Sequence, residues 1–265
     1  RDITIGQYYP AKSVLHRLDP RVKLTCTLLY LISLFLFKSI PGYIVATVFL
    51  AVVIRLSKVP FKYIMRGMKP VIMILLITVI FNLFLTKEGE VLLKVWVFTI
   101  TAGGLRTAVF MAIRLVYLIT GSSLMTFTTT PNELTDGIES LLHPLNKVHV
   151  PVHEIAMMMS IALRFIPILL EETDKIMKAQ IARGADLESG NMIQKAKNMI
   201  PILVPLFVSA FRRANDLAMA MEARCYRGGA GRTKMKPLHY EKRDHLAYLL
   251  MVSYMIAICV LRGVM

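Results

Sequence analysis

Two arginines stand in sequence settings that favour binding a partner by ion pairing. Arg183 lies in KAQIARG (178–184) and Arg224 in MAMEARC (219–225), so the pattern A-x-x-A-R plus a small residue occurs twice. A guanidinium group forms two parallel hydrogen bonds with a carboxylate, which an ammonium group cannot do. From spacing alone, each arginine could equally be a favourable charge near a helix C-terminus, worth about 0.3–1 kcal/mol. The repetition favours a paired docking device for a partner with two-fold or pseudo-two-fold symmetry.

Small residues surround both arginines and complete the two candidate docking motifs. Alanines one and four positions before each arginine leave space beside its side chain, so that the guanidinium group can enter a groove. We therefore assign the following residues to docking: Ala182, Arg183, Gly184, Ala223, Arg224 and Cys225.

The remaining reactive side chains do not form a catalytic or metal-binding set. His149 and His153 are four positions apart, but Pro151 lies between them and no third ligand has a suitable spacing. The three cysteines show neither a metal-binding nor a disulfide pattern. The loop RGGAGRTK (227–234) lacks the order of a phosphate-binding loop, and a basic loop that touches anionic lipid is the better interpretation. Any chemistry that the protein drives must therefore come from a partner.

Methionines are frequent in the segment that contains the two arginines. They either fill a core or form a surface that repacks against different partners, because the thioether side chain is flexible. Under the second interpretation, six of them form a candidate partner interface: Met157, Met158, Met159, Met177, Met192 and Met199.

The elements that hold these residues follow from the distribution of apolar side chains. Of the 265 residues, 55% are hydrophobic, and the mean hydropathy of +0.57 is unusual for a soluble domain. A helix needs about 20 apolar residues to cross a bilayer. Five runs approach that length and predict five transmembrane helices: 24–40, 43–56, 71–85, 105–127 and 246–261. The predicted fold class is an all-α integral membrane protein.

Lysine and arginine set the predicted orientation. The formal net charge of +15 could indicate nucleic-acid binding, but these residues alternate between frequent and scarce in successive connections. This alternation places the N-terminus in the cytoplasm, and five spans then place the C-terminus outside. The chain begins with polar residues, and we expect no signal peptide.

The chain divides into a membrane domain and a more polar insert. Residues 1–128 hold a leader and four spans, 129–245 form a cytoplasmic helical domain, and 246–265 add the fifth span to the membrane domain. In the leader, Asp19 followed by Pro20 is a favourable pair for the start of a helix.

The insert is predicted to contain one short helix and two long helices. TPNE at 130–133 supplies an N-cap, a first-turn proline and a capping-box acid for a helix over 131–142. Long helices should follow over 152–182 and 191–226. One proline should kink or break the first helix, and two prolines should bend the first half of the second. These prolines are Pro167, Pro201 and Pro205.

Two features leave alternatives open. Residues 91–101 are rich in β-branched and aromatic side chains, and they either form a hairpin or lie at the interface with Trp96 at headgroup level. Arg114 and Arg164 lie in apolar stretches, where an arginine either extends to the headgroups or pairs with an acid such as Glu154 or Glu171.

Six segments together resemble a known family. They are YPAKSVLHRLDPRVKL (9–24), LRTAVFMAIRL (105–115), TTTPNEL (128–134), ALRFIP (162–167), AQIARG (179–184) and MAMEARCYRGG (219–229). Over nearly its whole length, the chain resembles the transmembrane scaffold subunits (EcfT) of prokaryotic energy-coupling factor (ECF) transporters. The pair of Ala-Arg-Gly motifs is the most specific part of the resemblance. The chain departs from the family pattern at two positions. Cys225 stands where the second motif usually has glycine, and Ala11 stands where the leader usually has glycine.

The resemblance implies a non-catalytic coupling subunit in the plasma membrane. Such subunits join two ABC-type ATPases to a small membrane substrate-binding subunit, for uptake of vitamins or other micronutrients. It implies two long crossed coupling helices, with Arg183 docking one ATPase and Arg224 the other. The six methionines then become the candidate interface with the substrate-binding subunit. ATP and Mg²⁺ are used by the partner ATPases, and no cofactor is expected on this chain.

Two other function classes compete with this interpretation. An integral membrane enzyme acting on a lipid or prenyl substrate would need clustered Asp or His side chains near a membrane boundary, and the sequence shows no such cluster. A membrane-anchored nucleic-acid binder would use the basic insert. That insert mixes acids with its basic residues, which argues against a surface that follows phosphates.

Overall fold

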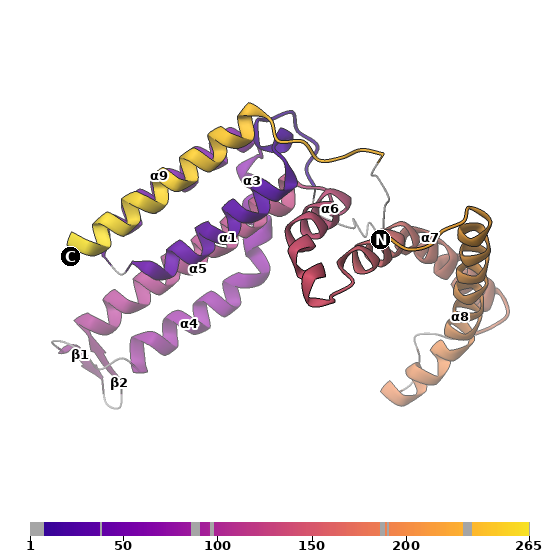
Figure 1. The fold of residues 1–265 in the computed structure, drawn as a ribbon. Coiled ribbons are helices and arrows are strands. Elements are labelled where there is room, and N and C mark those ends of the chain that lie inside the picture. The colour runs from indigo at the N-terminus through magenta and orange to yellow at the C-terminus, as the bar shows by residue number, and fades with distance from the viewer. Residues whose placement is uncertain are drawn as a thin grey trace. The chain divides into compact units, whose positions relative to one another are not determined.

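The computed structural model describes residues 8–37, 39–85, 91–95, 98–185, 189, 191–229 and 235–264. The chain folds into two compact units (Figure 1). The first unit combines Arg1–Leu141 with Leu238–Met265, and the second unit is Leu142–Pro237. The predicted cytoplasmic domain, 129–245, contains the whole second unit.

The first unit is built from long helices. They are α1 (Pro20–Leu36), α2 (Ile40–Ser57), α3 (Phe61–Met68), α4 (Ile72–Leu85), α5 (Ala102–Thr128), α6 (Pro131–Leu142) and α9 (Lys242–Val264), with 3-10 turns η1 (Leu15–Arg17) and η2 (Lys69–Val71). Helix α1 packs against α5 and α9, and α4 lies along α5 (Figure 1). The last helix of the chain therefore returns to the first.

Local sequence signals start two of these helices as predicted. The side chain of Asp19 accepts a hydrogen bond from the backbone nitrogen of Arg21 (2.9 Å), and Pro20 is the first residue of α1. Before α6, Thr130 Oγ1 accepts from the nitrogen of Glu133 (3.3 Å). Glu133 Oε2 accepts in return from the nitrogen of Thr130 (3.2 Å). This reciprocal pair is the predicted capping box.

The segment that could be a hairpin or an interfacial stretch contains two paired strands. β1 (Val91–Val95) and β2 (Phe98–Thr101) run antiparallel, and Val95 lies opposite Phe98. Trp96, the predicted interfacial residue, lies outside the described residues. The protein is otherwise helical where it is described, which confirms the predicted fold class.

Several helices are long and apolar enough to cross a membrane. Among the described residues, α2, α5, α7 (Val152–Ala182) and α9 meet this criterion, and α3 with α4 forms a fifth candidate bent by 61°. Four of the five predicted spans fall on these elements. Helix α1, with 17 residues, is shorter than α2, α5, α7 and α9, and α7 belongs to the insert. Length and composition therefore support a multi-pass membrane protein, while the five-span topology remains a prediction.

The core of the first unit lies where α1, α2, α5 and α9 meet. Tyr30 and Ile258 are buried there, and the rings of Phe49 and Tyr254 stack with centroids 4.3 Å apart. Helix α5 approaches α1 closely at Gly121, where an added Cβ would come within 2.5 Å of the Tyr30 ring. Any side chain at this position would therefore have to displace the Tyr30 ring.

Arg114 on α5 has a partner of a kind that the sequence did not suggest. Its Nη2 atom donates to the backbone oxygen of Phe37 (3.2 Å), at the C-terminal end of α1. Carbonyls in the last turn of a helix lack helical donors, and a cation near them is favourable. Arg114 therefore caps α1, and the acceptor of its Nη2 atom is a backbone carbonyl rather than an acid.

The second unit consists of the turn η3 (His143–Val148), α7, and α8 (Met192–Ala223). Both long helices occur where they were predicted, although α8 ends three residues earlier than expected. Pro167 lies inside α7, and Pro201 and Pro205 lie inside α8, without interrupting either helix. The predicted alternative of a break at Pro167 is therefore excluded, because a proline removes only one hydrogen bond from a helix that has many others. The kink at Pro167 and the bend at Pro201 and Pro205 remain predictions.

Candidate docking site

The end of α7 holds Arg183 in a left-handed helix cap. The nitrogen of Gly184 donates to the oxygen of Ile181 (2.9 Å), and the nitrogen of Ala185 donates to that of Gln180 (3.0 Å). Gly184 has φ +84°, the left-handed conformation that glycine adopts readily. These two bonds define a Schellman motif, which satisfies carbonyls that would otherwise be left free.

The end of α8 repeats this geometry around Arg224. The nitrogen of Cys225 donates to the oxygen of Glu222 (2.8 Å), and the nitrogen of Tyr226 donates to that of Met221 (3.0 Å). Cys225 has φ +55°, so it occupies the left-handed position that Gly184 occupies in α7. For a residue that has a Cβ, the left-handed conformation is less favourable than the right-handed one by roughly 1–2 kcal/mol of free energy. The sequence repeat is therefore also a structural repeat, and we call the two caps the arginine tips.

Both arginine tips are accessible to a partner. Arg183 and Arg224 are exposed, and so are the adjacent Ala182 and Ala223. Within the described parts of the chain, neither guanidinium group has an ion pair or a side-chain hydrogen bond. Each is therefore free to bind a carboxylate of another molecule.

The contacts between α7 and α8 place the two tips far apart. Gln180 near the end of α7 contacts Pro201 near the start of α8, and Glu172 contacts Arg213. The helices therefore run in opposite chain directions. At 1.5 Å per residue, this register separates Arg183 from Arg224 by roughly 30–40 Å along the pair. The tips are two separate docking points rather than one composite site.

A polar clamp fixes the middle of the helix pair. Glu172 on α7 accepts hydrogen bonds from Ser209 Oγ (2.5 Å) and from Arg213 Nε (3.2 Å) and Nη2 (2.8 Å) on α8. The Ser209 hydroxyl, together with Arg213, lowers the pKa of the Glu172 carboxyl below its ordinary value. Glu172, Ser209 and Arg213 are named the clamp below. Sequence reasoning missed it, because nothing in the spacing pairs residues 37 and 41 positions apart.

A second contact links the α7 tip to the proline-containing part of α8. Pro205 has no N–H group, so the carbonyl of Pro201 lacks its usual helical donor. Gln180 Nε2 donates to this carbonyl (3.3 Å). The backbone oxygen of Gln180 also accepts the hydrogen bond from Ala185 that closes the cap. Gln180 thus joins the Arg183 tip to α8.

An apolar groove of about 280 Å³ lies between the two helices. Its lining on α7 is Ile161, Phe165 and Leu169, and on α8 it is Ala210, Arg213, Ala214, Leu217, Ala218 and Met221. Alanines at every fourth position let α7 approach α8 closely. This alanine spacing was visible in the sequence and could have predicted the helix contact.

The candidate interface methionines whose side chains the structure describes do not line this groove. Met158, Met159 and Met199 are exposed, by 58%, 43% and 50% respectively. Met157 and Met177 are half-buried, and the side chain of Met192 lies outside the described residues. The exposed methionines are accessible to a partner, and core filling does not account for them.

Helix α8 also carries an exposed apolar stripe that the sequence analysis did not single out. Its members recur at helical spacing and are 41–69% exposed: Leu203, Val204, Phe207, Val208 and Phe211. Large exposed apolar patches are typical of protein or membrane contact surfaces. The 3.6-residue periodicity was the signal for it, but methionine was the more conspicuous residue type.

Comparisons with known proteins agree on one family. Residues 11–235 match the family described as "CbiQ: Cobalt transport protein". A protein of Clostridium kluyveri is 60% identical over 250 residues, covering 94% of this chain and 93% of its own length; it is named energy-coupling factor transporter transmembrane protein EcfT. Proteins of the same name from Thermosediminibacter oceani and Bacillus subtilis are 55% and 50% identical, over 94% and 91% of both chains.

Proposed function

Because the chain belongs to the CbiQ family and is the transmembrane component of an energy-coupling factor transporter, we propose that its arginine tips dock two ABC-type ATPases. One ATPase binds at Arg183 and the other at Arg224. The chain itself is non-catalytic, and ATP and Mg²⁺ are bound and used by the partners. A lipid- or prenyl-modifying enzyme, the alternative from sequence, finds no support among the relatives.

The observation that carries this proposal is the pair of matching helix ends. Both present an exposed guanidinium group that has no ion pair or side-chain hydrogen bond with another described residue, and both are flanked by small side chains. Their separation by roughly 30–40 Å suits two partner subunits better than one. A free arginine on a slim helix end binds a carboxylate in a groove with defined geometry.

The helix pair supplies a stiff connection between the two tips. ATP-driven movement of the ATPases displaces the tips, and the clamp keeps α7 and α8 moving together. The exposed apolar stripe of α8 and the exposed methionines Met158, Met159 and Met199 then form the surface that contacts a small membrane substrate-binding subunit. Reorientation of that subunit would release a vitamin or another micronutrient inside the cell.

The cellular setting belongs to the same proposal. The chain lies in a prokaryotic plasma membrane, with the N-terminus in the cytoplasm and the C-terminus outside, as the Lys and Arg distribution indicates. The second unit then faces the cytoplasm, where ATPases are available to dock.

The proposal is tested by replacing both tip arginines. Arg183→Glu combined with Arg224→Glu places an acid opposite each partner carboxylate, so the chain should insert into membranes but co-purify without ATPases. Arg212→Glu is the matched control, because Arg212 is also an exposed arginine on α8 but lies outside both tips. Normal ATPase retention by the double variant would refute the proposal.

A further inference from the structure

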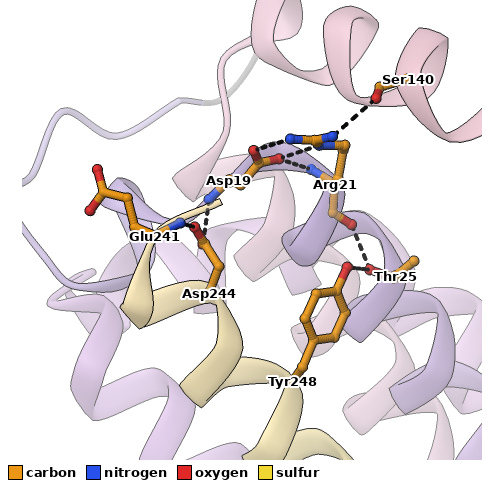
Figure 2. A network of polar contacts seen from close by, with 7 residues as sticks. All are labelled: Asp19, Arg21, Thr25, Ser140, Glu241, Asp244 and Tyr248. Carbon is orange, nitrogen blue, oxygen red and sulfur yellow. Dashed lines mark hydrogen bonds and ion pairs between the residues drawn. The ribbon is translucent and has the colours of Figure 1, made fainter. Parts of the chain in front are cut away.

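The first turn of α1 binds the ends of three other elements. Asp19, Arg21 and Lys23 occupy alternate positions in the segment DPRVK (19–23). All three have polar contacts with helices distant in the sequence, and Figure 2 shows most of this network. All of its members belong to the first unit.

Asp244 joins the N-terminus of α9 to that of α1. It is 2% exposed, its Oδ1 accepts from the nitrogen of Asp19 (2.9 Å), and its Oδ2 accepts from the nitrogen of Glu241 (2.8 Å). Glu241 precedes α9 directly, so one carboxylate satisfies N-terminal donors of two helices. Figure 2 shows Asp244 between the two chain segments.

Arg21 extends the network from α1 to α6. Its Nε and Nη2 atoms donate to the two oxygens of Asp19 (3.1 and 3.0 Å), and its Nη1 donates to Ser140 Oγ on α6 (3.3 Å). The guanidinium carbon lies 4.1 Å from the centroid of the Tyr240 ring, just before α9. Arg21 therefore contacts both the segment that leads out of the first unit and the segment that leads back into it.

Lys23 adds a third connection. Its Nζ atom donates to the backbone oxygen of Thr128 (2.8 Å) at the end of α5, and to that of His16 (3.2 Å). Carbonyls at a helix C-terminus favour a cation. The buried ammonium group thereby holds the end of α5, from which the chain continues to α6.

The position of this network along the chain gives it a role. The chain enters the second unit directly after α6 and returns through the segment before α9. Ser140 and Asp244 lie close to these two crossings, and both bind the first turn of α1. Movement of the second unit can reach the first unit through the covalent chain at these crossings.

We propose that Asp19, Arg21 and Asp244 form an anchor that holds both crossings together, so that they move as one body when the second unit moves. This inference rests on the proposed coupling function. Asp19, Arg21 and Asp244 are positioning residues, since none of them is placed in either docking tip. The anchor thereby ties the two connections between the units to one turn of α1.

The test measures the distance between α6 and α9, the helices next to the two crossings, in the complete complex with its ATPases. Spin labels are attached to Asn132→Cys on α6 and Lys242→Cys on α9, both exposed positions, in a background without the three native cysteines. With Asp244 intact, we expect one narrow distance distribution that is the same with and without ATP. In Asp244→Asn, we expect a broader distribution that shifts when ATP is added.

The controls separate the anchor from folding and from docking. Glu241→Gln removes a nearby exposed carboxylate whose side chain pairs only with Arg243 among the described residues, and it should leave the distance unchanged. If Asp244→Asn fails to fold, Arg21→Gln takes its place in the test. This variant keeps Asp244, and its distance distribution should also be broader. An unchanged distribution in a folded anchor variant that retains its ATPases would overturn the inference. Loss of ATPases from the unsubstituted chain would instead refute the proposed function.

Discussion

At the scale of single residues, the two arginine tips differ at one position. Gly184 and Cys225 fill the same left-handed site and make the same cap hydrogen bonds. The sequence showed the exchange of glycine for cysteine, but only backbone dihedral angles show that cysteine keeps the glycine conformation. The Arg224 tip therefore holds its shape at an energetic cost that the Arg183 tip avoids.

This asymmetry predicts opposite effects of two substitutions. Cys225→Gly should stabilise the protein by about 1 kcal/mol, raising the unfolding temperature by roughly 2–4 °C for a chain of this size. Gly184→Ala should lower the unfolding temperature by a similar amount. A Cβ at this position has open space, so only the left-handed backbone conformation is unfavourable. Thermal unfolding of both variants in detergent tests this. A destabilised Cys225→Gly variant would show that the cysteine side chain has stabilising contacts.

Whether Cys225 also selects the ATPase is a separate hypothesis. If it does, Cys225→Gly should change which ATPase is retained at the Arg224 tip during co-purification. Unchanged pairing would show that the cysteine is merely tolerated.

At the scale of elements, the helices could be predicted more fully than the contacts between them. The motifs at Asp19 and Thr130 started α1 and α6 as expected, since capping is a local interaction. The clamp joins Glu172 to residues near position 210, and no local pattern encodes such a pairing. The hairpin at 91–101 was undecided for the same reason, because strand pairing depends on neighbours.

The clamp predicts a pH-dependent stability. Partners that lower the pKa of Glu172 in the folded protein contribute stability above the unfolded pKa, and this contribution is lost as the pH falls through the folded pKa. Glu172→Gln should therefore lower the unfolding temperature near pH 7, and its effect should shrink as the pH falls through the lowered pKa of Glu172. Glu171→Gln, at the exposed neighbouring position, serves as the control. Equal effects of both substitutions near pH 7 would contradict the assigned role of the clamp.

At the scale of the whole molecule, composition and charge were sufficient to identify a multi-pass membrane protein with a polar insert. The span predicted at 24–40 and the cytoplasmic helix predicted at 152–182 stay predictions, because α1 is short for a span and α7 is apolar enough to be one. The anchor also lay beyond sequence reasoning, since Asp19 and Asp244 are 225 positions apart. Tertiary folding alone brings the two crossings of the chain to one turn of α1.

The central claim is that each arginine tip holds one ATPase. Native mass spectrometry of the purified complex measures this directly, by counting ATPase subunits bound to single variants. Arg183→Glu and Arg224→Glu should each retain one ATPase, and a different one if the two are not identical, while Arg212→Glu should retain both. The account would be contradicted if one of the single variants lost both ATPases, or if both single variants kept both ATPases.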